Sequence, residues 1–276
     1  MKQLMVCLSF DVDAMSGLVA RDMVTPNPIS RGEFGAVAVP RILNLLERQG
    51  IKGSFFIPGV VIGTYPRICE QIVRAGHEVG NHGWTHIPPA ALSLKDEDEG
   101  LARANEAIER LTGRKPTGYR SASWDLGPNT LKLLVKHGFL YESSMMGNDY
   151  EPYFVREGDK IYKTEPMEFG KKTSLVELPV SWSLDDFPHF EFLRMPNSVM
   201  NGLKDAEGVL SNWVGDFEYM CRICDWGILT YTFHPYVIGR GHRMLILERL
   251  IEILRGKGAT FITMEQAAQA YLARQK

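Results

Sequence analysis

Short apolar runs rich in β-forming residues alternate with longer amphipathic runs along the chain, and this alternation constrains the fold more than any other feature. The apolar runs predict strands at Leu4–Phe10, Gly53–Ile57, His77–Gly80, Thr117–Arg120, Leu175–Val180, Leu229–Phe233 and Thr260–Thr263. The amphipathic runs predict helices near Val37–Gln49, Pro66–Ala75, Leu94–Leu111, Pro128–His137, Ala206–Cys224, Met244–Lys257 and Met264–Arg274. A repeated strand-then-helix unit predicts a parallel sheet with covering helices, and this many units favour an α/β barrel over an open sheet.

Local signals mark where several of these helices begin and end. Ser93 precedes Leu94-Lys95-Asp96 and is a plausible N-cap with an acidic third residue. Glycines follow four of the helical runs, at Gly50, Gly76, Gly113 and Gly138. A helix C-terminus favours glycine because the capping residue adopts a positive φ.

Two segments, 14–35 and 145–174, do not fit the repeat. Both are long and carry glycines and charges, which is typical of connections without regular structure. Long loops in such folds often cover a binding site. We therefore expect these two segments to wall off the mouth of the barrel.

Composition limits the classes of function. The 276 residues, 45% hydrophobic and 23% charged, suit a single catalytic domain spanning 1–276. With 31 basic and 33 acidic residues, the net charge of −2 favours neither a nucleic-acid partner nor a membrane partner. The apolar run Leu4–Phe10 is too short for a signal-peptide core or a membrane span, so we expect a cytoplasmic protein.

Two pairs of residues have the chemistry of a metal centre. His82 and His86 lie four positions apart in Gly80-Asn81-His82-Gly83-Trp84-Thr85-His86, so on a turn or helix both imidazoles could reach one metal ion. Asp11 and Asp13 end the first strand, where residues i and i+2 share a face. One carboxylate could bind the cation while the other acts as a base toward water. Taken alone, each pair could equally be a solvated turn or two satisfied histidines.

Two further polar residues end predicted strands. His234 follows the apolar strand Leu229–Phe233, and Arg120 ends the strand Thr117–Arg120. The carboxyl ends of parallel strands are where α/β folds place chemistry. An arginine there can hold a carboxylate ionised and oriented, although a surface ion pair is the alternative. His77, which opens a strand, is more plausibly structural.

In order, the four motifs Phe10-Asp11-Val12-Asp13, His82-Gly83-Trp84-Thr85-His86, Arg120-Ser121-Ala122-Ser123-Trp124 and Phe233-His234-Pro235 resemble the polysaccharide deacetylase (NodB-homology) family. The resemblance covers roughly residues 4 to 265. It implies a distorted (β/α)7-8 TIM-like barrel of the NodB type. It also implies a hydrolase that cleaves carbon–nitrogen bonds with a divalent metal, Zn²⁺ or another such as Co²⁺, Ni²⁺ or Mn²⁺.

Carried over position by position, the resemblance also implies residue roles. The metal ligands would be Asp13, His82 and His86. Asp11 would be the general base, oriented by Arg120, and His234 the general acid toward the leaving nitrogen. Asp185 or Asp186 would hold the tautomer of His234 or line the pocket. We further expect a backbone N–H after Arg120 to stabilise the oxyanion of the tetrahedral intermediate.

The chain departs from the common family pattern at its first motif. The usual adjacent aspartates followed by glycine are here separated by Val12 and followed by Ala14. This spaced form resembles a branch with cytoplasmic peptidoglycan-deacetylase-like and cyclic-imidase-like proteins. A relative of this branch that resembles allantoinase is thought to work without a metal.

Three functions follow. The first is removal of an N-acetyl group from an amino sugar or glycan, and the second is hydrolysis of a small cyclic imide or amide. Four aromatic residues are predicted to line the pocket or to pack at the barrel mouth: Trp84, Trp124, Phe187 and Tyr236. The third function, an inactive binding module, would require a broken constellation, and this one is intact.

A homo-oligomer, a dimer or a tetramer, is also expected. The apolar stretches Pro179–Trp182 and Phe187–Phe192 are the candidate contacts between copies of the chain.

Overall fold

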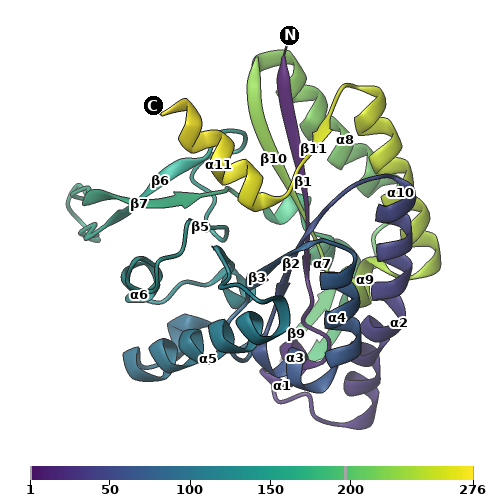
Figure 1. Ribbon diagram of the computed structural model, residues 1–276, viewed down its shortest axis with the longest axis horizontal. Coiled ribbons are helices and arrows are strands. Elements are labelled where there is room, and N and C mark those ends of the chain that lie inside the picture. The colour runs from purple at the N-terminus through teal and green to yellow at the C-terminus, as the bar shows by residue number, and fades with distance from the viewer. Residues whose placement is uncertain (1, 196–197, 276) are drawn as a thin grey trace.

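A curled sheet forms the centre of the computed structural model, which describes residues 2–195 and 198–275 (Figure 1). Its strands pair in the order β10-β1-β2-β3-β4-β5-β7-β6, and β11 also pairs with β1. Their bounds are β1 Gln3–Asp11, β2 Ser54–Ile57, β3 Glu78–Asn81, β4 Gly118–Tyr119, β5 Tyr141–Glu142, β6 Tyr153–Glu157, β7 Lys171–Glu177, β10 Trp226–Phe233 and β11 Thr260–Phe261. A separate hairpin contains β8 Phe192–Met195 and β9 Ser198–Asn201.

The sheet is parallel from β10 through β7, and only β6 pairs antiparallel. In the described part of the chain, β7 and β10 are not paired as strands, although a single parallel bridge joins Asp185 to Thr232. The result is an open, distorted barrel, which confirms the α/β barrel predicted from the sequence.

Helices cover the outer face of this sheet (Figure 1). The α-helices are α1 Ser16–Val19, α2 Pro26–Arg48, α3 Gly59–Thr64, α4 Pro66–Arg74, α5 Leu94–Thr112, α6 Thr130–His137, α7 Asp186–Phe190, α8 Ala206–Ile223, α9 Pro235–Ile238, α10 Gly241–Gly256 and α11 Met264–Arg274. Ser93 caps α5 by accepting a hydrogen bond from the Asp96 N–H, and Gly113 ends that helix at φ +79°. Both ends of α5 therefore follow the local signals in the sequence.

Aromatic and aliphatic side chains fill the space between sheet and helices. Phe10 stacks on Phe55 with ring centroids 4.8 Å apart and lies 5.5 Å from Phe233. All three rings are buried and come from β1, β2 and β10. This packing fixes the mutual register of the strands that end in Asp11 and precede His234.

The two segments expected to be irregular contain regular structure. Residues 14–35 hold α1 and the start of α2, which begins at Pro26 rather than near Val37. The helix passes so close to the preceding turn that a Cβ on Gly32 would lie 2.5 Å from the Met15 Cα. The glycines that suggested a loop therefore permit close packing of a helix.

Residues 145–174 form most of the β6–β7 hairpin, which extends away from the barrel at the left of Figure 1. Several of its apolar residues, such as Ile161 and Phe169, are exposed, so apolar and polar residues do not alternate regularly in this part of the sequence. The strand β5 was not predicted for a different reason: its two residues are too few to show a period.

Within the described residues, no helix combines the length and the apolar character that a membrane crossing requires.

His77 gives a testable link between pH and stability. Its Nδ1 accepts a hydrogen bond from the Gly53 N–H (3.0 Å), and its ring lies 5.1 Å from that of Phe55. Burial, aided by Lys52, lowers the pKa of His77 to about 4. An unfolded histidine has a pKa of about 6.5. The contribution of the neutral His77 ring to the free energy of unfolding is therefore fully present above that pH and is lost as the pH falls toward 4.

We expect the unfolding free energy of the wild type to fall by about 2–3 kcal/mol more than that of His77→Asn between pH 7 and pH 4. The amide oxygen of asparagine can accept the same hydrogen bond without titrating. Urea unfolding at several pH values measures the difference. Identical pH slopes for the two proteins would contradict this account.

Candidate active site

The predicted catalytic and metal-ligating residues meet at the carboxyl edge of the sheet. Six of them lie at or just after the ends of β1, β3, β4 and β10: Asp11, Asp13, His82, His86, Arg120 and His234. Asp185 and Asp186 lie at the start of α7. Around them is a pocket of about 310 Å³. It is lined by Asp11, Asp13, Arg21, His82, His86, Ser123, Trp124, Trp182, Asp185, Phe187, Pro188, Met200 and His234.

Asp13 faces both predicted metal-binding histidines. Its Oδ1 lies 3.3 Å from the His82 Nε2, and its Oδ2 lies 3.1 Å from the His86 Nε2. All three side chains are buried. Burial alone would raise the pKa of Asp13, but His86 and His82, with His234, hold it well below its ordinary value.

The hydrogen bonds of this triad fit the binding of a divalent cation. The His82 Nδ1 lies 2.8 Å from the backbone carbonyl of Arg120, which can only accept, so that nitrogen carries the proton. In the neutral ring, the form that binds a metal, the lone pair of the His82 Nε2 faces the lone pairs of the Asp13 Oδ1. Neither atom has another hydrogen-bond partner among the described residues. A divalent metal ion between them would satisfy both, and an Asp-His-His set suits one.

The loop after β3 sets the spacing of the two histidines. The sequence left open a turn or a helix, and the structure has an irregular loop in which Gly83 adopts φ +76°. The Gly83 N–H donates to the Asn81 side chain (2.7 Å), which fixes the start of the loop. The two imidazole rings end up 5.2 Å apart and nearly perpendicular.

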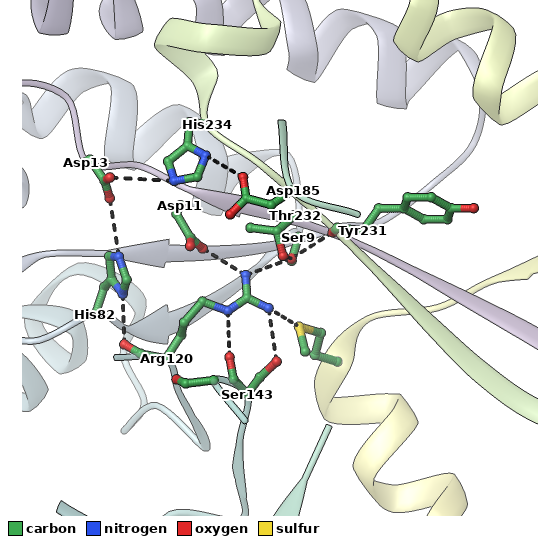
Figure 2. A network of polar contacts seen from close by, with 12 residues as sticks. Ser9, Asp11, Asp13, His82, Arg120, Ser143, Asp185, Tyr231, Thr232 and His234 are labelled. Carbon is green, nitrogen blue, oxygen red and sulfur yellow. Dashed lines mark hydrogen bonds and ion pairs between the residues drawn. The ribbon is translucent and has the colours of Figure 1, made fainter. Parts of the chain in front are cut away.

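Asp11 takes a different partner from Asp13. Its Oδ1 accepts a hydrogen bond from the Arg120 Nη1 at 2.9 Å, and both side chains are buried. The first strand therefore delivers one carboxylate to an arginine and the other to a pair of histidines. Figure 2 shows Asp11 pointing at Arg120, while His82 and His234 point at Asp13.

Residues that the sequence did not single out hold Arg120 in place. Its guanidinium donates to the Ser9 hydroxyl (2.8 Å), to the Ser143 hydroxyl (3.0 Å) and carbonyl (2.9 Å), and contacts the Met264 sulfur at 3.7 Å (Figure 2). Ser9 could have been found from sequence because it lies two positions before Asp11 on the same strand face. Ser143 and Met264 carry no such signal, since only the fold brings β5 and α11 beneath the arginine.

Asp185 and Asp186 occupy different positions relative to His234. Asp186 is fully buried and lies 2.7 Å from the His234 Nδ1, and it also accepts the His234 backbone N–H at 3.0 Å. Asp185 lines the pocket, lies 3.5 Å from the same nitrogen and caps α7. Asp186 thus orients the imidazole, and Asp185 faces the ligand space.

These carboxylates control the charge of His234. Burial alone would lower the pKa of His234, but Asp185 and the hydrogen-bonded Asp186 raise it well above its ordinary value. Burial also raises the pKa of Asp185 to about 8. The His234 Nε2 lies 3.7 Å from the Asp13 Oδ2, so the two sets of residues meet across the pocket.

Two of the four predicted pocket aromatics lie in the pocket wall. Trp124 and Phe187 line it, and Trp182 stacks on Trp124 with centroids 4.3 Å apart. Trp84 instead lines a neighbouring cavity and stacks against Arg103. Tyr236 is buried behind His234. The prediction that Trp84 and Tyr236 line the pocket is wrong, because Trp84 packs against Arg103 of α5 and Tyr236 belongs to the buried core.

The pocket walls also differ from the loops expected to form them. Arg21 comes from 14–35, but the lining includes no residue of 145–174. The remaining wall comes from Trp182–Pro188 and the β8–β9 hairpin, which contributes Met200. The stretches proposed as contacts between copies therefore supply pocket and core residues, and the expected homo-oligomer stays a prediction.

The first N–H after Arg120 is already occupied. The Ser121 N–H donates to the Ser144 hydroxyl at 2.8 Å, so it cannot also bind an oxyanion. The next turn carries positive φ angles at Ser123 (56°) and Trp124 (53°). Such strain in residues other than glycine is common at functional sites, and here it aims both residues at the pocket.

Comparison with known proteins agrees with this geometry. The model of the polysaccharide deacetylase family matches residues 24–141. A peptidoglycan deacetylase of Helicobacter pylori is 36% identical over 99% of this chain and 98% of its own length. The chain belongs to the polysaccharide deacetylase family. It is therefore a hydrolase by class, as the order of its motifs predicted.

Solved structures extend the comparison. A Mycobacterium smegmatis protein assigned to the polysaccharide deacetylases superposes with a TM-score of 0.86 at 32% identity, covering 99% of this chain and 92% of its own. The Puue allantoinase superposes with a TM-score of 0.78 at 20% identity, over 99% of this chain and 91% of its own. The latter likeness shows a shared fold.

We expect His82→Ala to lower the affinity for Zn²⁺ by at least about 100-fold. The substitution removes a direct ligand, and loss of a residue that only hydrogen-bonds a ligand already lowers metal affinity by about 10- to 100-fold. Asp11→Asn should retain the metal, because Asp11 is bonded to Arg120 instead. Metal content after dialysis and thermal stabilisation by Zn²⁺ provide the measurements. If Asp11→Asn loses the metal while Asp13→Asn keeps it, the two aspartates have been assigned in reverse.

Proposed function

We propose that this protein is a metal-dependent deacetylase that removes the N-acetyl group from an amino sugar of a glycan. The observation that carries the proposal is the unsatisfied Asp13–His82–His86 triad, which lies in one pocket with Asp11 and His234. Membership of the polysaccharide deacetylase family and the similarity to a peptidoglycan deacetylase along the full chain support a glycan substrate.

Asp13, His82 and His86 would hold the metal, and the proposed ion is Zn²⁺. When bound, it would supply Lewis-acid polarisation of the amide carbonyl and of the attacking water. Nitrogen and carboxylate ligands also suit Co²⁺, Ni²⁺ or Mn²⁺, so the ligand set alone does not select the metal.

Asp11 is the proposed general base. Its hydrogen bond to Arg120 fixes the orientation of the carboxylate, which lines the pocket. Asp11 would remove a proton from the water that attacks the carbonyl carbon, giving a tetrahedral intermediate. Arg120 acts through Asp11, because its own N–H groups are directed to Ser9, Ser143 and Asp11.

His234 is the proposed general acid. Its raised pKa favours the protonated imidazole, and Asp186 directs the Nε2 side of the ring toward Asp13 and the pocket. From this position His234 would donate a proton to the leaving nitrogen as the carbon–nitrogen bond breaks. The products are acetate and a free amine on the sugar.

Hydrolysis of a small cyclic imide or amide is the second candidate, because it breaks the same kind of bond. The pocket of about 310 Å³ has room for a ligand the size of one ring. A cytoplasmic location and a homo-oligomeric state, dimer or tetramer, stay predictions from the sequence.

A side-by-side assay with Zn²⁺-loaded protein separates the two reactions. We expect acetate release from N-acetylglucosamine oligomers, and a fall of at least about 100-fold in kcat for Asp11→Asn. Ring opening of succinimide and hydantoin is the parallel measurement. Ring opening without acetate release would replace the deacetylase proposal with an imidase.

The two neighbouring aspartates should differ in their effect on turnover. Asp186→Asn removes the partner that fixes the His234 tautomer, so we expect kcat to fall about 100-fold or more. Asp185→Asn should cost less, because Asp185 lies farther from the imidazole. Steady-state kinetics of both variants measure this, and an equal loss in both would assign the orienting role to the pair.

A further inference from the structure

Arg21 is the one lysine or arginine that lines the pocket in the described part of the chain. It lies just after α1, in the segment that follows the Asp11 and Asp13 motif. The other charged groups in the wall, apart from the histidines, are the carboxylates of Asp11, Asp13 and Asp185. Arg120 is already bonded to Asp11, whereas Arg21 forms no ion pair with any described residue.

The position of Arg21 relative to the triad follows from Gly17. A Cβ on Gly17 would lie 3.4 Å from the Arg21 Nη1, 3.5 Å from the His86 Nδ1 and 3.6 Å from the Asp13 Oδ2. The guanidinium of Arg21 therefore lies close to the side chains of Asp13 and His86, and all three residues line the pocket. A substrate whose amide is held at the triad would present its neighbouring groups to Arg21.

Two hydrogen bonds hold the guanidinium of Arg21 in place. Its Nη1 donates to the Gly17 carbonyl at 2.5 Å, its Nη2 lies 3.4 Å from the Ser123 hydroxyl, and its guanidinium carbon lies 6.0 Å from the centre of the Phe187 ring. These contacts orient the group, and its other N–H atoms form no hydrogen bond with any described residue. A planar guanidinium with free N–H groups matches a carboxylate in both charge and shape.

We propose that Arg21 binds a carboxylate that the substrate carries close to its scissile amide, so the enzyme prefers acidic N-acetylamino sugars to neutral ones. This inference rests on the proposed deacetylase function and narrows its substrate class. Trp124, stacked with Trp182, forms the apolar part of the wall for the sugar ring, and Arg21 supplies the charge.

A purely structural role makes a different prediction. The bond from Arg21 to the Gly17 carbonyl could serve only to close the last turn of α1. Loss of such a bond would loosen the segment that carries Asp13 and would impair every substrate alike. The discriminating quantity is therefore the ratio of kcat/KM for an acidic and a neutral substrate.

N-acetylmuramic acid and N-acetylglucosamine form a matched pair, because they differ only by a carboxylate-bearing ether beside the acetamido group. We expect the wild type to favour the acidic sugar, and Arg21→Gln to lower the acidic-to-neutral ratio by about 10- to 100-fold. Arg21→Lys should retain part of the preference. Arg67→Gln, an equal charge change at an exposed position on α4 outside the pocket lining, is the control and should keep the wild-type ratio.

Binding is measured separately from turnover, by calorimetry with each sugar and equal metal loading of both proteins. Selective binding of the acidic sugar that Arg21→Gln removes supports the inference, even if neither sugar is turned over and the deacetylase function fails. Equal losses with both sugars, or a wild type that binds and turns over the neutral sugar better, overturns it.

Discussion

The buried ion pair between Arg120 and Asp11 is the interaction on which the rest of the site depends. A guanidinium with no exposure to solvent is costly unless each of its N–H groups finds an acceptor. Here the oxygen acceptors come from two strands: Ser9 and Asp11 lie in β1, and Ser143 follows β5. The arginine therefore locks together strands that are far apart in sequence, and removal of either charge would leave the other unpaired in the core.

The carboxylates of the site each have a different partner. Asp11 is neutralised by Arg120, Asp13 faces the two histidines, and Asp186 is bonded to His234. Each carboxylate is buried, so each interaction is strong and specific rather than averaged by solvent. Asp185 lacks so close a partner, and its burial raises its pKa to about 8. Four acidic residues with similar intrinsic chemistry thus differ through their neighbours alone.

Much of the candidate site could be predicted from the sequence because its residues lie in short motifs at strand ends. The alternation of strand and helix by itself predicts that Asp11, His82, Arg120 and His234 lie at the same edge of the sheet. The pocket wall could not be predicted in this way. Trp84 and Trp124 both follow strand-end motifs, yet one faces a neighbouring cavity and the other faces the ligand space.

The sequence by itself determined the fold class, the family and the identity of the residues that meet at the sheet edge, because these depend on local periodicity and on motifs of a few residues. Only the tertiary structure decided which aspartate orients His234, that Ser121 is engaged by Ser144, and that Arg21 reaches the pocket. Those outcomes depend on how segments distant in sequence pack and on where positive φ angles turn the chain. A period of two or of 3.6 residues carries no information about either.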